Sequence, residues 1–378
     1  MTNSFMDLCL LTCFIFVSQP GMQGKLACQS IRIIMILQTF ALAYYSFHKD
    51  QSMKNHSDSN SLTPGCKIGW IGAGRMGFAM AKRLLEAGCD VAVYNRTLVK
   101  AEPLMEWGAA IVDSPAELAG CDIVFTMVSG PADLLEVITG DAGVLSGAQA
   151  PQLVVDCSSV SEDGSNRVRQ ALSERGAAML SAPVSGNAKV VTAGKLTLVA
   201  SGPAAAFATA EPYLQILGTG VTYVGEGELA RMVKICHNVL LGVVTQCLAE
   251  ITVLAEKGGV PRHALLDFIN NSVMGSMFSR YKSPAFVNLD WTPTFTPVLL
   301  LKDLDLGLSA GDALGVPMAV TQATRDLVEQ VINAGYTDCD FGILLEQQAR
   351  AAGMQLEPEN MEVDDGLHLS TGKDGYQS

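Results

Sequence analysis

The sequence predicts an α/β fold in which a mainly parallel β-sheet covered by helices is followed by an all-helical domain. From Lys67 to about Val224, short apolar runs alternate with stretches of helical periodicity, as expected for a parallel sheet with crossover helices. After Gly227 the strand pattern stops and a long helical stretch begins. A glycine-rich segment follows directly after the first predicted strand.

The predicted strands are short apolar runs bounded by turn residues. Strands of a parallel sheet are buried on both faces, so they are continuously apolar rather than alternating. The runs that fit are Lys67–Ile71, Val91–Tyr94, Ile123–Met127, Leu153–Asp156, Met179–Ser181, Thr197–Ala200 and Val221–Val224. Helical periodicity fills gaps between them, as in Met76–Ala87 and Ala204–Ile216. These elements predict a first domain over residues 67–227.

A second domain is predicted over residues 228–356 from helical patterns alone. Glu228–Lys257 contains no proline, and Gly258-Gly259 with the following Pro261 predicts its end. Further helices are predicted at His263–Asn270, Pro297–Leu314 and Val320–Ala334. Residues 357–378 are acidic and poor in apolar residues, which predicts a disordered tail.

The first 66 residues differ from the rest of the chain. The apolar runs Leu8–Val17 and Ile31–Tyr45 are both shorter than the ~20 residues of a membrane-spanning helix. Residues 46–64 are polar and are typical of a linker. Three interpretations compete: a weak membrane anchor, a targeting segment, or an extension outside the folded protein. We favour the third, with Met53 as a candidate start of the folded protein.

Composition narrows the class of protein. The 378 residues are 49% hydrophobic and 17% charged, which is a globular composition. A net charge of −13 argues against nucleic-acid partners, because phosphate neutralisation needs clustered Lys and Arg. The ten cysteines are scattered singly with no CxxC motif, so neither a zinc site nor a disulfide framework is favoured. We therefore expect a cytoplasmic protein without a bound metal or a membrane partner.

The glycine-rich segment has the pattern of a phosphate-binding turn. It reads Gly72-Ala73-Gly74-Arg75-Met76-Gly77, a GxGxxG between a strand and an apolar helix. In a Rossmann-type domain the first glycine turns the chain, the second admits a pyrophosphate and the third lets helix and strand pack closely. The alternative is an ordinary glycine-rich strand–helix turn. The context favours binding of a dinucleotide.

The end of the second predicted strand indicates which dinucleotide is preferred. An acidic residue about 20 positions after the glycines would bind the adenosine ribose 2′-hydroxyl. This chain has Asn95-Arg96-Thr97 there, and an Arg can pair with a 2′-phosphate. The sequence therefore predicts a preference for NADP(H), with NAD as an alternative. A solvated surface Arg96 is the other interpretation.

The long predicted helix carries a polar stripe. Lys234, Asn238, Gly242 and Thr245 recur at spacings of three and four, so they share a face. Among apolar neighbours, Lys234 would lose solvation and its pKa would fall, which suits general acid–base chemistry. The alternative is a Lys that extends to the surface beside a core Asn. His237 is interpreted as a structural histidine rather than a metal ligand.

Together these segments resemble the β-hydroxyacid dehydrogenase family over about residues 67–356. This family includes 3-hydroxyisobutyrate dehydrogenases, tartronate semialdehyde and glyoxylate/succinic semialdehyde reductases, and 6-phosphogluconate dehydrogenases. The resemblance rests on the cofactor signature at 71–80, the substrate segment at 182–187, the catalytic helix at 227–238 and the later motif Lys302-Asp303-Leu304.

The resemblance implies a nucleotide-binding domain, a helical domain and an active site between them. It implies that Lys234 donates and accepts the proton, that Asn238 orients the substrate, and that Lys302 contacts cofactor or substrate. The substrate carboxylate would be bound by Ser185 and the backbone of Gly186. Further cofactor contacts would come from Met127, Val128 and Ser159.

The chain departs from the family pattern near the substrate. Asn187 replaces a second glycine and would add a side chain at the substrate carboxylate, Ser159 replaces a usual Thr, and Ser181 stands where Asp is common. The order Lys-x-x-His-Asn is similar to the 6-phosphogluconate branch, but the second domain is too short for its larger forms. The departures leave the substrate open.

The expected reaction is hydride transfer between NADP(H) and a small hydroxy acid or its semialdehyde, without a metal. An imine reductase and a non-catalytic NADP-binding protein are the alternatives. Imine reductases typically have Asp or Tyr where this chain has Lys234, and a scaffold would lack the lysine. The apolar circumference of Glu228–Lys257 favours a homodimer or homotetramer.

Overall fold

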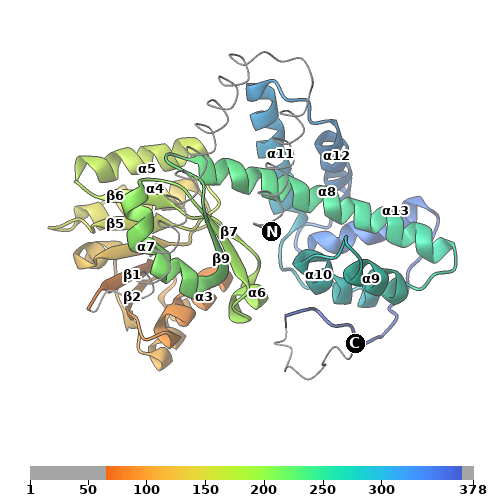
Figure 1. The fold of residues 1–378 in the computed structure, drawn as a ribbon, viewed down its shortest axis with the longest axis horizontal. Helices are drawn as coiled ribbons and strands as arrows, with labels where there is room; N and C mark the ends of the chain where they lie inside the picture. The colour runs from red at the N-terminus through yellow and green to blue at the C-terminus, as the bar shows by residue number, and fades with distance from the viewer. Residues whose placement is uncertain (1–64, 368–378) are drawn as a thin grey trace, which may run out of the picture. The chain divides into compact units, whose positions relative to one another are not determined.

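The computed structural model describes residues 65–367 (Figure 1). The interpretations of residues 1–64, including Met53 as a start, lie outside the described residues. The first strand begins at Lys67, as predicted.

A six-stranded parallel sheet forms the first part of the described chain. Its strand order is β3-β2-β1-β4-β5-β6. The strands are β1 (Lys67–Ile71), β2 (Asp90–Tyr94), β3 (Ala110–Ile111), β4 (Ile123–Thr126), β5 (Leu153–Asp156) and β6 (Ala178–Ser181). The chain order reverses between β1 and β4, and in such sheets the ligand crevice lies at the carboxyl ends of these strands. The predicted Rossmann-type sheet is confirmed.

Helices cover both faces of this sheet because each strand is apolar on both sides. In β4, Ile123 and Phe125 pack into one core and Val124 into the other. The first core includes α3 (Arg75–Glu86) and α7 (Ala204–Leu217), and the second includes α4 (Pro131–Thr139) and α5 (Glu162–Glu174) (Figure 1). The helices predicted at Met76–Ala87 and Ala204–Ile216 are confirmed within a residue at each end.

A separate three-stranded sheet follows and corrects one expectation. It comprises β7 (Val184–Ser185), β8 (Leu196–Ala200) and β9 (Gly218–Tyr223), with β7 antiparallel to β8. The last two predicted strands therefore belong to this second sheet, not to the main one. The strand β7, which is two residues long, was not predicted because it is too short for any periodicity. The short helix α6 (Ala188–Thr192) connects β7 and β8.

The remaining described elements are helical. They are α8 (Leu229–Lys257), α9 (Arg262–Asn271), α10 (Met277–Asn288), α11 (Pro297–Leu314), α12 (Ala319–Asn333) and α13 (Leu344–Ala351). The predicted all-helical region is confirmed. Short 3-10 helices occur at Leu98–Lys100, Glu102–Trp107, Pro115–Gly120, Val144–Ser146 and Phe341–Ile343.

By length and composition, α8 could cross a membrane, but a core helix of a water-soluble protein passes the same test. This helix packs against α11, α12 and α13, and it contains the buried polar residues Arg231 and Asn238. Half of its most apolar 18-residue window is buried inside the protein.

Part of the predicted disordered tail packs against the folded chain. Glu359 accepts hydrogen bonds from the backbone N–H groups of Arg262 and His263 at the start of α9. The Lys195 ammonium donates to the Gly366 carbonyl, and the Leu367 side chain is buried. Residues 357–367 thus lack helix and strand but have fixed partners, and 368–378 lie outside the described residues.

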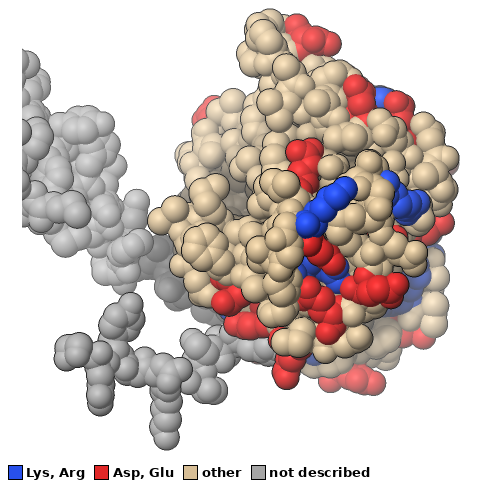
Figure 2. Space-filling view, turned by 90° about the vertical axis from the view of Figure 1, so that its right-hand side faces the viewer, with Lys and Arg blue, Asp and Glu red and all other residues tan. Residues whose placement is uncertain are grey.

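Charges of both signs lie close together on the face shown in Figure 2, with uncharged surface around them. A nucleic-acid surface would present a continuous basic stripe, which this face does not have.

Candidate active site

The glycine turn is built for close backbone approach. Gly72 has φ +99°, and a Cβ there would lie 2.2 Å from the Met127 carbonyl oxygen at the end of β4. A Cβ on Gly77 would lie 1.9 Å from the Gly72 oxygen. Gly74 is exposed with nothing within 4 Å of its Cβ position, and within the described chain no side chain caps α3. The open helix N-terminus fits a dinucleotide pyrophosphate.

Asn95 and Arg96 lie beside this turn. The Asn95 side-chain oxygen accepts a hydrogen bond from the Ala73 backbone at 2.8 Å, and its amide donates to the Thr97 carbonyl. Arg96 is 82% exposed, and its guanidinium is 2.9 Å from the Asp133 carboxylate of α4. An exposed ion pair of this kind is weak, so Asp133 can give way to a stronger anion.

The other predicted cofactor contacts surround the same crevice. Val128 lies next to Gly72, with its Cγ1 3.6 Å from the Gly72 Cβ position, and its backbone N–H donates to the Ser158 hydroxyl. Ser159 is exposed just beyond the end of β5. The guanidinium of Arg75, also in the turn, donates to the Pro293 carbonyl between α10 and α11.

A buried ion cluster, missed in the sequence analysis, fixes the start of α8. The Arg231 guanidinium lies 2.7 Å from the Asp156 carboxylate at the end of β5 and 2.7 Å from that of Glu228. Arg169 of α5 binds the other Glu228 oxygen. Burial opposes ionisation of Glu228, but Arg169 and Arg231 outweigh it and lower its pKa. In the sequence, the signal for this cluster was Arg231, a cation one helical turn before Lys234.

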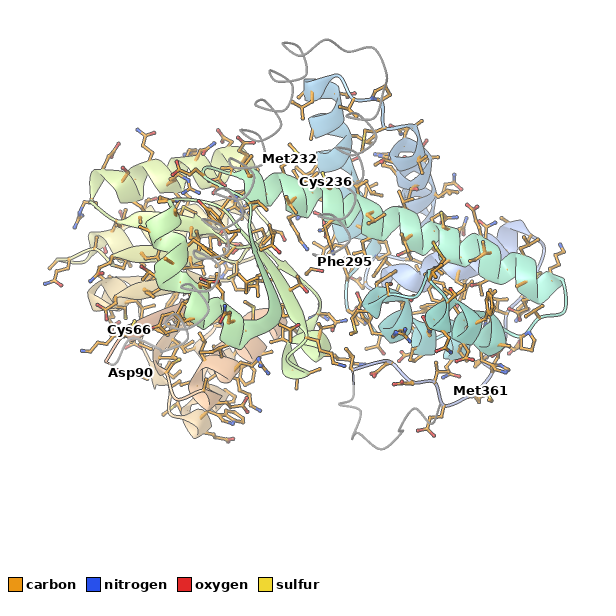
Figure 3. All side chains as sticks on the ribbon, viewed as in Figure 1. Cys66, Asp90, Met232, Cys236, Phe295 and Met361 are labelled. Atoms are coloured by element: carbon orange, nitrogen blue, oxygen red, sulfur yellow. The ribbon has the colours of Figure 1, made fainter. Side chains whose placement is uncertain are left out.

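In the sequence of α8, Lys234 lies between Met232 and Cys236. These two neighbours are labelled on the helix in Figure 3. Its ammonium donates to the Val184 carbonyl at 2.7 Å, so it is directed at β7. Removal from water lowers the pKa of Lys234 to about 8; Asp303 opposes this decrease and Lys302 adds to it. The amine therefore changes charge near neutral pH. The structure therefore excludes the alternative in which the Lys234 side chain extends into solvent.

His237 and Asn238 connect β7 to α11. His237 Nε2 lies 2.7 Å from the Ser185 hydroxyl, and Nδ1 lies 2.9 Å from the Asn238 side-chain oxygen. The Asn238 amide donates to Asp303 at 2.6 Å, and Lys302 lies 3.4 Å from the other Asp303 oxygen. Asn238 is therefore held on both sides. His237, interpreted from sequence as structural, belongs to the site through Ser185.

Gly242 and Thr245, the C-terminal half of the polar stripe, take part in helix packing and not in the chemistry of the site. A Cβ on Gly242 would lie 2.9 Å from Leu300 of α11, and one on Gly307 would lie 2.3 Å from Val239. Thr245 is buried and donates to the Leu241 carbonyl. Glycines on both helices thus let α8 and α11 approach closely, which brings Asp303 to Asn238.

Gly186 and Asn187 shape the segment after Ser185. Gly186 has φ +134°, which favours glycine, and a Cβ there would meet Val190 at 2.8 Å. The Asn187 side chain caps α6 by accepting from the Val190 backbone at 3.1 Å. The Asn187 oxygen is therefore engaged within its own segment as the cap of α6.

Some of these residues line a narrow cavity, whereas Ser185, Gly186, Asn187, His237 and Lys302 are not part of its lining. Its lining includes Ser158, Ser159, Pro183, Lys234, Asn238 and Asp303. The cavity measures about 20 Å³, which is room for a water molecule. A small substrate would have to widen it. Within residues 65–367, no three His, Cys, Asp or Glu side chains gather where they could hold a metal ion.

Comparisons with known proteins match both parts of the described chain. Residues 67–225 match the family described as the NAD binding domain of 6-phosphogluconate dehydrogenase. Residues 228–347 match the family described as NAD-binding of NADP-dependent 3-hydroxyisobutyrate dehydrogenase. These ranges coincide with the strand-rich and helical regions.

Relatives include enzymes and one nuclear factor. Glyoxylate/succinic semialdehyde reductase 1 of Arabidopsis thaliana is 31% identical over 74% of this chain and 97% of its own. Cytokine-like nuclear factor N-PAC of Homo sapiens is 31% identical over 77% of this chain and 53% of its own. The structure of 3-hydroxyisobutyrate dehydrogenase from Salmonella typhimurium is similar with a TM-score of 0.68, at 27% identity over 75% of this chain and 99% of its own.

Proposed function

Because the chain belongs to the 3-hydroxyisobutyrate dehydrogenase family of NAD(P)-dependent oxidoreductases, we propose that it reduces a small semialdehyde, or oxidises the corresponding hydroxy acid, with Lys234 as general acid–base. The family predicted from the sequence is thereby confirmed. The observation that carries the proposed mechanism is the Lys234 amine, directed at β7 and with a pKa lowered to about 8.

The residues of the glycine turn fit the dinucleotide. The exposed Gly74 and the uncapped start of α3 would hold its pyrophosphate, and Met127 and Val128 would flank it. Arg96 would leave Asp133 for the 2′-phosphate of NADP(H), which supports the preference over NAD. When bound, the nicotinamide supplies or accepts the hydride.

Lys234 completes the proton balance. In reduction the substrate carbonyl carbon gains a hydride, and its oxygen takes one proton from the Lys234 ammonium, which leaves a neutral amine. In oxidation the neutral amine takes the hydroxyl proton as the hydride departs. A pKa of about 8 makes both forms accessible near neutrality, which general acid–base catalysis requires. The same cation stabilises negative charge developing on the substrate oxygen.

The substrate carboxylate would be bound next to the contact that Lys234 makes with β7. Ser185 follows Val184, whose carbonyl holds Lys234, so the proton donor and the carboxylate contact would be one residue apart. Gly186 would offer its backbone there. Asn238 would orient the substrate with its remaining amide N–H, since its other groups are engaged by His237 and Asp303. The exposed Lys302 would attract the anionic substrate.

The experiment is an NADPH-consumption assay over glyoxylate, succinic semialdehyde, methylmalonate semialdehyde and tartronate semialdehyde. We expect turnover of at least one, and the Arabidopsis relative makes glyoxylate and succinic semialdehyde the first to test. The Lys234→Met variant is the control for the mechanism. NADPH binding without turnover of any of them would contradict the proposed reaction and favour the non-catalytic alternative.

We also propose a cytoplasmic location and a homo-oligomeric assembly. The described cysteines are all free thiols, which supports a reducing compartment such as the cytoplasm. Exposed apolar side chains along α8, namely Leu229, Val233, Leu240, Ile251 and Leu254, support a homodimer or homotetramer. Sedimentation would decide the oligomeric state.

A further inference from the structure

The hydrogen bonds around His237 fix which groups donate. Asp303 as a carboxylate can only accept, so Asn238 must present its Nδ2–H group to it, at 2.6 Å. The Asn238 oxygen then necessarily faces His237 Nδ1, at 2.9 Å. Because that oxygen can only accept, Nδ1 carries a proton in either charge state of the imidazole.

The proton on Nδ1 determines what Ser185 can do. In neutral His237 the other ring nitrogen, Nε2, has no proton and can only accept. It lies 2.7 Å from the Ser185 hydroxyl, so that hydroxyl must donate its single proton to His237. Ser185 is then left with lone pairs alone, and it cannot donate to a substrate carboxylate.

When His237 is protonated, the hydrogen bond between its Nε2 and Ser185 reverses direction. The bonds from His237 to Asn238 and from Asn238 to Asp303 stay unchanged. The imidazolium donates from Nδ1 to Asn238 as before, and from Nε2 to the Ser185 oxygen. The Ser185 proton is then free for the carboxylate. The other way to place a proton on Nε2 alone would turn Nδ1 into an acceptor facing the Asn238 oxygen. The bond between Asn238 and Asp303 prevents that arrangement.

We propose that His237 is a positioning residue that takes up one proton from solvent when a carboxylate substrate binds, and thereby turns the Ser185 hydroxyl toward that carboxylate. The inference rests on the proposed function, because it assumes that the substrate carries a carboxylate and that Ser185 binds it.

The charges around His237 fit this exchange. On α8, the charged neighbour of His237 is the Lys234 ammonium. On the side of α11, Asn238 connects His237 to Asp303, and Lys302 lies beyond Asp303. On the side of β7, His237 contacts the uncharged Ser185 hydroxyl. Burial lowers the pKa of His237, Lys234 lowers it further and the bond to Asn238 opposes the decrease, so the neutral imidazole is favoured without substrate. A bound carboxylate adds a negative charge that favours the imidazolium.

The test is calorimetric titration of 4-hydroxybutyrate or glycolate into the NADPH-bound enzyme at pH 7. Cofactor and ligand are both reduced, so binding occurs without turnover. Repeating the titration in buffers of different ionisation enthalpy counts the protons taken up. We expect about one proton per bound acid. Lys234, with a pKa of about 8, is mostly protonated at pH 7 and contributes little.

Two variants and a control assign the proton. His237→Gln keeps an amide that donates to Ser185 at every pH, so it should bind the acid with no proton uptake. Ser185→Ala should lose the uptake and bind roughly tenfold more weakly, as expected for one hydrogen bond to a charged group. His263→Gln changes a histidine that pairs with Glu359 and is 39% exposed, and it should retain the full uptake.

The outcomes separate this inference from the proposed function. Binding of the acid without proton uptake, or with equal uptake in His237→Gln, overturns the role of His237 and leaves the proposed reaction standing. Failure of the NADPH-bound enzyme to bind either acid at any pH overturns the proposed substrate class and this inference with it.

Discussion

The Arg231 guanidinium lies 2.7 Å from the Asp156 carboxylate, and both side chains are buried. This pair joins the first turn of α8 to the carboxyl end of β5, where the crevice of the parallel sheet opens. Lys234 follows one helical turn later, so the ion pair fixes the distance between the proposed proton donor and the cofactor-binding turn.

Replacing Arg231 should therefore destabilise the protein. In Arg231→Met, Asp156 and Glu228 lose a buried partner, and breaking a buried pair in this way costs about 3–5 kcal/mol. Urea unfolding at pH 7 measures the change in unfolding free energy. Glu86→Gln, which removes a surface ion pair with Lys82, should cost less than about 1 kcal/mol. Equal decreases in unfolding free energy in the two variants would show that the buried ion cluster stabilises the protein no more than a surface ion pair does.

Replacing Lys234 should remove turnover and leave cofactor binding intact. Lys234→Met lacks the proton donor, and general acid–base catalysis is worth about 10²–10⁴-fold in rate. Steady-state kinetics gives kcat, and NADPH fluorescence gives the dissociation constant. Lys257→Met, at the other end of the same helix, removes only a hydrogen bond to the Ala352 carbonyl and should retain activity. Near-normal kcat in Lys234→Met would discard the assignment.

The two reaction directions should depend on pH in opposite ways. Reduction needs the Lys234 ammonium, so its kcat should fall as pH rises through about 8, whereas oxidation needs the neutral amine and should increase over the same range. The measurement is kcat against pH in both directions.

Lys302 offers a sharper test of that pKa. Its positive charge contributes to lowering the pKa of Lys234, so Lys302→Met should move the pH profile to higher pH. Asp303→Asn removes a charge that raises the same pKa and should move the profile to lower pH. Shifts in the same direction would exclude electrostatic control by these two side chains.

Arg96 should decide the preference between NADP and NAD. Arg96→Asp should lower kcat/KM for NADPH by about 10–100-fold relative to NADH, as charge-assisted hydrogen bonds to a phosphate are lost. Asp133→Asn frees Arg96 from its ion pair and should maintain or improve use of NADPH. If the ratio of kcat/KM for NADPH to that for NADH is unchanged in Arg96→Asp, Arg96 is a solvated surface residue without a role in cofactor preference.

Elements with a strong local pattern were predicted well. Strands β1, β4 and β5 are continuously apolar because both faces are buried, and α8 and α11 end at glycines near the predicted positions. By contrast, α10 contains Pro284 and β7 is only two residues long, so neither has a readable period. The composition of residues 357–367 predicts disorder, yet Glu359 and Gly366 are held by partners distant in sequence.

The candidate site divides in the same way. The glycine turn and Lys234 could be found from sequence because their chemistry depends on residues close together in the chain. Ser185 and His237 are 52 residues apart, and Asp156 and Arg231 are 75 apart, so no spacing rule relates them. Their pairing depends on where α8 crosses the ends of the strands.

By itself, the amino-acid sequence determined the order of strands β1, β2, β4, β5 and β6, the dinucleotide turn and the presence of a lysine on an apolar helix. Only the tertiary structure decided that this lysine is directed at Val184 and that His237 belongs to the site. The physical reason is that backbone conformation follows local residue patterns, whereas desolvation and hydrogen-bond direction depend on groups that other elements bring into contact.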